Sequence, residues 1–443
     1  AYTDWMIGSY LGLFNYSFSN KYYLDATYRR EGSSRFPSAN RWGNFWSVGA
    51  AWNIHNEDFM ADTNLFSNLR LRGSYGINGN TGNGVNEYQS LLAYDADYSS
   101  QAGSYTSSYG NKDLTWEKNE ILDLGLEFGF LDDKITGSFA YFDRTTKDLL
   151  LDVPLSFTTG SEEQIQNVGE MTNKGIELEL NFDVIRSQDL NFSIGGNLAT
   201  VENEVTKMNS NSAGEESVIE SSTRKVEVGH AVYSWNMKKW AGVDPATGNP
   251  LWYVNGKDGE TTGTYSVAEK AYQGGSALPT LTAGLNTHVD YKGFYLDANL
   301  YYAGGHKVYE DWAFYTYHQY YGLYYYQNVD VMMDRWQQPG DITDVPRLGT
   351  DSALNNSSST STRFLYDGDY IRLKDLVVGY TFPEVFSSKI GMTSVKAYVR
   401  GTNLFTWVKD DRLKYDPEVQ ASGFTRLSSP PTKSITVGFN FNF

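Results

Sequence analysis

The sequence predicts an all-β fold, namely an antiparallel transmembrane β-barrel with long loops at one end and short turns at the other. Three observations predict it. Apolar and polar residues alternate in many short stretches, short and long connections alternate between those stretches, and aromatic residues make up 15% of the chain. Successive side chains of a strand point to opposite faces, so each stretch has one apolar face and one polar face. Strands with lipid on the outside and a polar lumen on the inside have this pattern.

The clearest of these stretches covers residues 432–443. Its apolar face carries two aliphatic and three aromatic side chains, namely Ile435, Val437, Phe439, Phe441 and Phe443. Only small or polar residues occupy the positions between them. We expect this stretch to be the strand that closes the barrel, with its apolar row in contact with outer-membrane lipid.

The other strands follow in order along the chain. Their alternating faces cover residues 8–18, 22–29, 46–52, 69–77, 122–130, 135–141, 176–182, 192–198, 281–291, 294–302, 376–382 and 395–399. With the last stretch, this gives about thirteen clear strands, or fifteen if the Trp-rich residues 226–254 add two more. Long loops, expected to be extracellular and to contain short helices, alternate with short periplasmic turns.

The number of strands bears on the extent of the chain. An odd number places the two ends on opposite sides of the membrane, whereas complete bacterial single-chain barrels have an even number. We therefore expect residues 1–443 to be one partial barrel domain, with the N-terminal part of the same barrel outside this sequence. Whether that part is a separate chain stays open.

Composition and motifs argue against several other classes of protein. A net charge of −17 makes nucleic acid an unlikely partner, and the absence of Cys excludes disulfides. No apolar run is long enough for a transmembrane helix. The five His never fall in a zinc-binding spacing, and no nucleophile elbow or phosphate loop is present. Paired carboxylates such as Glu177 and Glu179 fit a hydrated lumen wall better than a glycosidase site. We expect no enzyme activity, no cofactor and no metal.

Six strings in series carry a family resemblance. In one-letter code they are NKDLTWE at 111–117, NVGEMTNKGIE at 167–177, DRW, PGD and VPR between 334 and 347, YIRLK at 370–374 with GYTFP at 379–383, GTNLF at 401–405, and YDPE at 415–418. In this order and at these intervals they resemble the barrel of SusC/RagA-type TonB-dependent transporters of Bacteroidetes, over nearly the whole chain.

The resemblance implies a barrel of about 22 strands in the bacterial outer membrane. It also implies a SusD-like surface lipoprotein as a lid, and TonB as the energy source through an N-terminal segment outside this sequence. The cargo would be an oligosaccharide or a peptide. The alternative is a SusC-like barrel that serves as a scaffold subunit without cargo of its own. Residues 252–259 depart from a calcium loop of the family, because one carboxylate and a Lys suit a plain hairpin turn better.

The best candidate for binding is the long insertion at residues 304–369, which is rich in aromatic side chains. The candidates for ligand or partner contact are Trp312, Tyr315, Tyr317, Tyr320, Tyr321, Tyr324 and Trp336. Phe314, Tyr317, Tyr321 and Tyr324 recur at helical spacing, and Asn328 could cap a second short helix. Aromatic faces stack on sugars or grip proteins, so we expect partner contact first, internal packing second and ligand contact third.

Two further groups have simpler explanations. Trp235, Trp240 and Trp252 are expected to anchor the membrane interface. The paired cations Arg70 with Arg72, and Arg372 with Lys374, are expected to belong to a hydrated lumen wall.

Overall fold

The computed structural model describes residues 4–63, 65–82, 84–161, 163–209, 216, 218–318, 330–350, 354, 356–389, 391–426 and 428–443. These residues form two compact units, each described by itself below. The first unit comprises Ala1–Val184, Asn197–Ile219 and Glu227–His230, and the second comprises Ile185–Gly196, Glu220–Val226 and Ala231–Phe443. None of the helices in the described ranges has the length and apolar character needed to cross a membrane.

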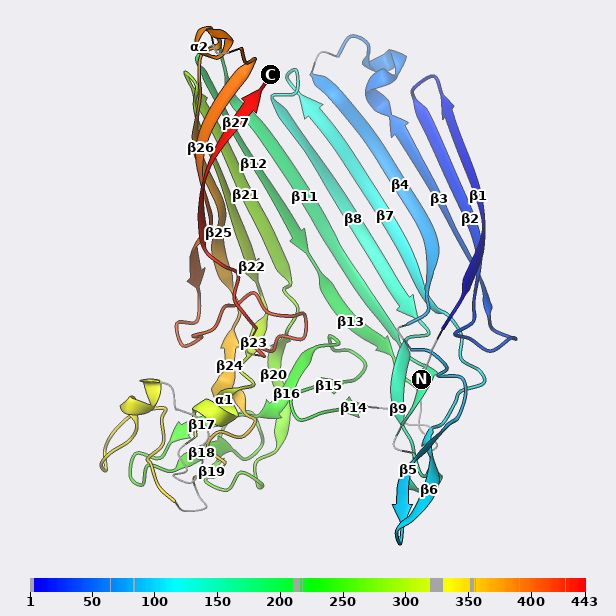
Figure 1. Ribbon diagram of the computed structural model, residues 1–443, viewed down its shortest axis with the longest axis vertical. Helices are drawn as coiled ribbons and strands as arrows, with labels where there is room; N and C mark the ends of the chain where they lie inside the picture. The colour runs from blue at the N-terminus through cyan, green and yellow to red at the C-terminus, as the bar shows by residue number, and fades with distance from the viewer. Residues whose placement is uncertain are drawn as a thin grey trace. The chain divides into compact units, whose positions relative to one another are not determined.

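The first unit is built on a sheet of long, tilted antiparallel strands that lie side by side (Figure 1). Its strands, in both chain and sheet order, are β1 (Ile7–Phe18), β2 (Tyr22–Ser33), β3 (Trp42–Asn53), β4 (Phe66–Asn80), β7 (Glu117–Phe130), β8 (Ile135–Lys147) and β11 (Glu170–Arg186). The β1–β2 hairpin turns through Ser19 and Asn20 at φ 51° and 55°. Positive φ at both central residues matches the right-handed twist of the flanking strands.

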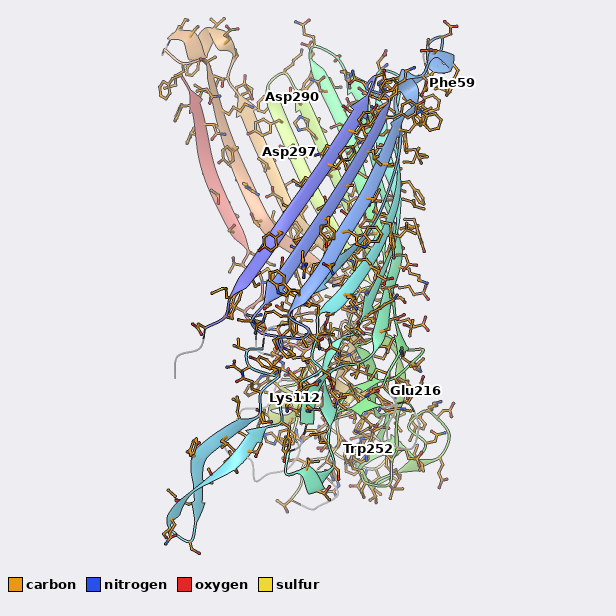
Figure 2. The ribbon with its side chains drawn as sticks, turned by 90° about the vertical axis from the view of Figure 1, so that its right-hand side faces the viewer. Phe59, Lys112, Glu216, Trp252, Asp290 and Asp297 are labelled. Carbon is orange, nitrogen blue, oxygen red and sulfur yellow. The ribbon has the colours of Figure 1, made fainter. Side chains whose placement is uncertain are left out.

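Shorter elements connect these strands at the long-loop end of the first unit. They are the hairpin of β5 (Leu91–Tyr98) with β6 (Gln101–Ser108), the pair β9 (Leu150–Pro154) with β10 (Glu163–Asn167), the turn η3 (Phe157–Thr159), and β13 (Glu202–Lys207), which pairs with β11. At the other end lie η1 (Ile54–Asn56) and η2 (Asp58–Met60), where Figure 2 shows Phe59 far from Lys112.

Two of the strings noted in the sequence meet in the first unit. The backbone N–H of Thr115 donates to Oδ1 of Asn167 at 2.7 Å, and Nδ2 of Asn167 donates back to the Thr115 carbonyl at 2.8 Å. Trp116 is buried against Phe36 and Phe45, and its indole N–H donates to the carbonyl of Arg41. The two strings therefore fasten the loops to one another over a small apolar cluster.

The second unit has a sheet of the same kind. Its strands are β12 (Leu190–Thr200), of which residues up to Gly196 lie in this unit, β21 (Leu281–Tyr291), β22 (Phe294–Gly304), β25 (Tyr370–Thr381), β26 (Ser394–Val408) and β27 (Ser434–Asn442). The six-residue helix α2 (Glu384–Lys389) fills the connection between β25 and β26 (Figure 1). In the described residues, seven such strands of the first unit and six of the second match the thirteen that the sequence predicts.

The apolar rows of these strands do not form a dry core. In β27 and the residue after it, Ile435 is 74% exposed, Val437 67%, Phe439 60%, Phe441 49% and Phe443 89%. The rows of other strands include further exposed side chains, among them Val48, Leu71, Leu124, Phe139, Leu285 and Val378. A sandwich would bury such rows between two sheets. Exposed rows instead provide the apolar outer surface that a membrane strand requires.

Smaller elements form a compact loop region at the end of the second unit away from α2 (Figure 1). They are β14 (Ile219–Glu220), of which Glu220 lies in this unit, β15 (Lys225–Val226), β16 (Ser234–Lys238), β17 (Trp240–Val243), β18 (Pro250–Tyr253), β19 (Thr261–Thr262), β20 (Lys270–Ser276), β23 (Lys307–Tyr309), α1 (Ala313–Thr316), η4 (Asp330–Asp334), η6 (Thr362–Phe364) and β24 (Leu365–Asp367). β16, β17 and β18 belong to small separate sheets, so residues 226–254 add no strand to the long tilted strands described above.

Candidate functional site

The candidate site lies in the loop region of the second unit, where the long insertion docks on the β17–β18 hairpin. The indole Nε1 of Trp336 donates to the carbonyl oxygen of Pro245 at 3.0 Å. Nε of Arg347 donates to Oδ1 of Asn249 at 3.1 Å, and the backbone N–H of Arg347 donates to the Gly248 carbonyl. These contacts explain two of the strings noted in the insertion, because each string supplies one side chain to the same hairpin.

The hairpin turn is held by its own aspartate. Asp244 accepts hydrogen bonds from Oγ1 of Thr247 at 2.6 Å and from the backbone N–H of Ala246 at 2.9 Å. The Thr247 hydroxyl and this backbone N–H stabilise the carboxylate, so they lower the pKa of Asp244 below its ordinary value. Gly248 follows at φ +72°, a conformation that favours glycine. The turn is therefore pre-shaped to receive the insertion.

The loop region also contains a buried aromatic cluster. Trp235 is fully buried, with its ring centroid 5.8 Å from that of Tyr309. Tyr317 is also buried, with its ring centroid 5.3 Å from that of Phe364. Residues from β16, β23, α1 and η6 meet in this one cluster. The loop region is thus a small folded body with its own core.

A cavity of about 560 Å³ opens beside the cluster. That volume is within the range of small-ligand sites in proteins. Its lining combines aromatic rings with charged groups of both signs, including Trp240, Tyr253, Tyr317, Tyr366, Lys239, Arg363, Arg412, Lys414, Asp344 and Asp411. Rings that stack on flat apolar faces, together with charged groups that bind polar ends, suit a solute such as a sugar or a peptide segment.

Two buried ionisable side chains lie at or beside the cavity. Arg363 lines it, donates from Nη1 to the Ser357 carbonyl at 2.7 Å, and lies 5.0 Å from the Trp240 ring centroid. Burial lowers the pKa of Arg363 to about 10, so the guanidinium stays charged at neutral pH. Glu310 is fully buried and accepts a hydrogen bond from the Tyr366 hydroxyl at 3.3 Å. Burial raises the pKa of Glu310 to about 7.

The aromatic residues predicted for ligand or partner contact differ in how deeply the structure buries them. Trp312 and Tyr315 are half-buried and pack against each other, with ring centroids 5.0 Å apart and ring planes tilted by 42°. Trp336 is half-buried on the hairpin. Tyr317 is buried and lines the cavity. Three candidates lie outside the described residues, namely Tyr320, Tyr321 and Tyr324.

The predicted aromatic helix face is not found where the structure can test it. Helix α1 ends at Thr316, so Phe314 is in the helix and Tyr317 is already beyond it. The remaining positions of that face, together with Asn328, lie outside the described residues. Met332 on the second segment is buried in the cluster, and its 3-10 turn ends at Asp334. Internal packing, placed second in the sequence analysis, accounts for Tyr317.

The expectation for the second aromatic group is wrong. Trp235 and Trp252 are fully buried, which excludes them as anchors at a membrane interface. Trp252 packs edge-on against Trp240 and Tyr265, at centroid distances of 5.6 and 5.3 Å. The possible short strands of residues 226–254 are present as β16, β17 and β18, but they lie in the loop region. Sequence alternation alone does not distinguish the two locations.

The paired cations of the strands bind carboxylates of this chain. Arg372 is buried and its Nη2 lies 2.5 Å from Oδ1 of Asp416, while Lys374 lies 2.7 Å from Glu418. Two strings noted in the sequence are thereby joined. In the first unit, Arg72 pairs with both Asp123 and Glu127 across the β4–β7 ladder. These cations are structural members of the polar face.

Some site residues escaped the sequence analysis. Glu310 and Arg363 look like ordinary loop residues in the sequence, and no spacing pattern marks them.

The turn at residues 253–259 is as predicted, since Oδ1 of Asn255 accepts hydrogen bonds from the backbone N–H groups of Lys257 and Asp258. Among the residues that the structure describes, no group of three or more His, Asp or Glu could hold a metal ion.

Comparisons with known proteins agree on one family. The family model described as TonB dependent receptor-like, beta-barrel matches residues 3–404. TonB-dependent receptor P3 of Formosa agariphila is 30% identical over 98% of this chain and 45% of its own length. TonB-dependent receptor SusC of Bacteroides thetaiotaomicron is 28% identical over 98% of this chain and 43% of its own length.

A solved structure is similar over the same extent. The structure titled "Structure of the RagAB peptide transporter" matches with a TM-score of 0.85 and 29% identity, over 99% of this chain and 48% of that one. The chain therefore spans about half the length of the relatives that it matches.

Proposed function

The chain belongs to the TonB-dependent receptor-like β-barrel family of outer-membrane proteins, and from this premise we propose that it is part of an active importer of oligosaccharides or peptides. Its named relatives are receptors and transporters, so the family points to a protein that is not an enzyme. In this proposal the exposed apolar rows hold the chain in lipid, and the loop region receives the cargo.

The observation that carries the proposal is the cavity of about 560 Å³ in the loop region. It is lined by aromatic rings and by charges of both signs, and it rests on a buried core that keeps its walls in place. A pre-formed cavity binds more tightly than one that must order its walls when the cargo arrives. The similarity to a structure titled as a peptide transporter supports a peptide, and the similarity to SusC leaves an oligosaccharide equally open.

We further propose that a SusD-like lipoprotein covers the insertion and that TonB supplies the energy through a segment outside this sequence. Four apolar side chains of the insertion are exposed, namely Phe314, Met333, Ile342 and Leu348. Exposed apolar side chains mark a protein-binding surface where they form one contiguous patch, and in this proposal the lipoprotein covers these four. Tyr315 is half-buried edge-on to Phe314, with ring centroids 5.1 Å apart, and Trp312 packs on Tyr315, so both rings would contribute to that contact.

The test is uptake by cells that lack the gene for the full protein. Restoring the gene should restore uptake of defined peptides or oligosaccharides, and only in a strain with functional TonB. Arg412→Gln in the cavity should reduce that uptake several-fold, whereas Arg426→Gln should not. Both arginines are exposed and each pairs with one aspartate, but only Arg412 lines the cavity. Normal uptake without the gene, together with loss of a companion protein from the membrane, would favour the scaffold role instead.

A further inference from the structure

The short helix α2, between β25 and β26, has two unlike faces. At about 100° per residue, Val385, Phe386 and Lys389 lie on one side of the helix and Ser387 lies on the opposite side. Ser387 is fully buried and α2 packs on β26, whereas Val385 is 70% exposed and Phe386 is 48% exposed. The helix therefore turns its polar Ser toward the protein and its apolar side chains outward, the reverse of a helix that packs on a soluble core.

The exposed face of α2 continues the apolar row of the strands. Ring centroids are 4.5 Å apart between Phe294 and Tyr380, 5.2 Å between Tyr380 and Phe382, and 5.1 Å between Phe382 and Phe386. Tyr380 and Phe382 follow Val378 at every second residue, so they share its face. One unbroken column of rings thus runs from the lipid-facing row of β22 and β25 onto the helix.

The height of the apolar band places the helix at its edge. Exposed aromatic residues Phe405 and Trp407 stack at the other end of β26, and Trp407 pairs with Ile371 of β25. From Ile371 to Tyr380 the strand rises about 30 Å, which at a tilt of about 40° spans about 23 Å along the membrane normal. The apolar band of outer-membrane barrels is about 25 Å tall with aromatic girdles at both edges. Tyr380 and Trp407 match those two girdles, and α2 follows directly beyond Tyr380.

We propose that α2 is an interfacial anchor, lying along the phospholipid surface on the side of the short turns. Val385 and Phe386 enter the acyl boundary, and the aliphatic stem of Lys389 follows them while its ammonium group reaches the lipid phosphates. The helix is fixed for this role at both ends. The backbone N–H of Ser387 donates to the Pro383 carbonyl, and Gly391 at φ +76° turns the chain back toward β26.

The partner is lipid because the face continues a lipid-facing surface without interruption. The site is a binding surface separate from the loop region, so it holds or fails independently of the proposed import. A second copy of the chain or a periplasmic protein would also cover Val385, and the experiment separates these cases.

The experiment uses the full-length protein in phosphatidylcholine–phosphatidylglycerol vesicles. This chain has no Cys, so Val385→Cys, with any cysteine outside this chain replaced by Ser, takes a nitroxide label at one position. We expect the label to be several-fold more accessible to oxygen than to a water-soluble nickel complex. Glu384→Cys, at an exposed position about 100° around the helix from Val385, is the matched control and should show the reverse preference.

Two results would overturn the proposal. Preference of the Val385→Cys label for the nickel complex would show that the face is in water. Protection from both reagents would show that protein covers it. A normal heat-modifiable band on gels establishes that each labelled variant is folded. A second arm, with a fluorophore at the same position, should be quenched at least twofold by lipids brominated near the headgroup. Absence of quenching in the folded variant would also contradict the proposal.

Discussion

The indole N–H of Trp336 donates to the carbonyl oxygen of Pro245 at 3.0 Å, and this bond joins segments 91 residues apart. The same ring lies over Gly248, where an added Cβ would come within 2.5 Å of it. The docking of the insertion on the β17–β18 hairpin is therefore a close fit between one large side chain and one position without a side chain. The backbone N–H of Trp336 also donates to the carbonyl of Val345, a residue that lines the cavity of the proposed function.

Replacing Gly248 by Ala should loosen this docking. The new methyl group meets the Trp336 ring, and the left-handed backbone adds a strain of about 1–2 kcal/mol. We expect faster proteolysis and faster hydrogen exchange at residues 330–350. Gly259→Ala is the matched control, because Gly259 has φ +82° and open space around it. Equal effects of the two substitutions would mean that the ring contact contributes nothing.

Breaking the buried ion pair of Arg372 should destabilise the loop side of β25. Arg372→Met leaves the largely buried Asp416 without its cation, while Glu418 keeps its pair with Lys374, so the cost should be about 1–3 kcal/mol. Lys374→Met, at a more exposed position of the same strand, should cost at most about 1 kcal/mol. Thermal unfolding of the full protein in detergent measures both. A smaller loss for Arg372→Met than for Lys374→Met would contradict the assignment.

The stability of the loop region should fall as the pH rises toward neutral. Burial raises the pKa of Glu310 to about 7 in the folded protein, so this carboxyl keeps its proton at a pH where the unfolded chain has lost it. The contribution of Glu310 to the free energy of unfolding is fully present below the pKa that this carboxyl has in the unfolded chain. It is lost as the pH rises through about 7, the pKa in the folded protein. The total change is roughly 3 kcal/mol.

Glu310→Gln tests this dependence, because the amide keeps the shape and carries no charge. Hydrogen exchange at residues 307–317 should slow in the variant at pH 8 and change little at pH 5. In the wild-type protein, the free energy of opening of residues 307–317 can be obtained from exchange rates corrected for the intrinsic effect of pH. If this free energy is the same at pH 5 and at pH 8, Glu310 does not carry a proton in the buried state.

The apolar row of β27 should be required for assembly. Phe439→Arg places a charge on the lipid face near the middle of the strand, at a cost of about 2–4 kcal/mol. Asn440→Arg puts the same charge on the opposite face of the same strand and should be tolerated. The fraction of heat-modifiable protein in the outer membrane measures both. Deleting Phe439–Phe443 should block assembly for the same reason, because it removes the end of the lipid-facing apolar row.

The strands were predictable from the sequence because every second residue of a membrane strand faces lipid and is apolar, whereas the residues between face a polar lumen. In the described residues, the thirteen alternating stretches correspond to the thirteen long strands, and of the strands paired with these only the short strand β13, which pairs with β11, was not predicted. The sequence left open whether the Trp-rich residues 226–254 add two membrane strands, and the structure shows that they do not. Trp252 is buried under Trp240 and Tyr265 in the loop region, and a short buried strand has the same pattern as a membrane strand.

The candidate site was predictable only as a segment. The aromatic content of the insertion marked it as the place to examine, but which rings would be buried depends on contacts distant in sequence. Tyr317 meets Phe364, and Trp336 meets Pro245. Glu310 and Arg363 owe their properties to burial, which no local pattern encodes.

The most direct test of the account measures which face of β27 meets lipid. Nitroxide labels introduced one at a time at positions 435 to 440 of the full protein, in vesicles, report oxygen and nickel-complex accessibility. We predict a period of two, with maximal oxygen accessibility at Ile435, Val437 and Phe439 and maximal nickel accessibility at the positions between them. Low accessibility to both reagents at the three apolar positions would contradict the account, since it would mean that protein rather than lipid covers the row.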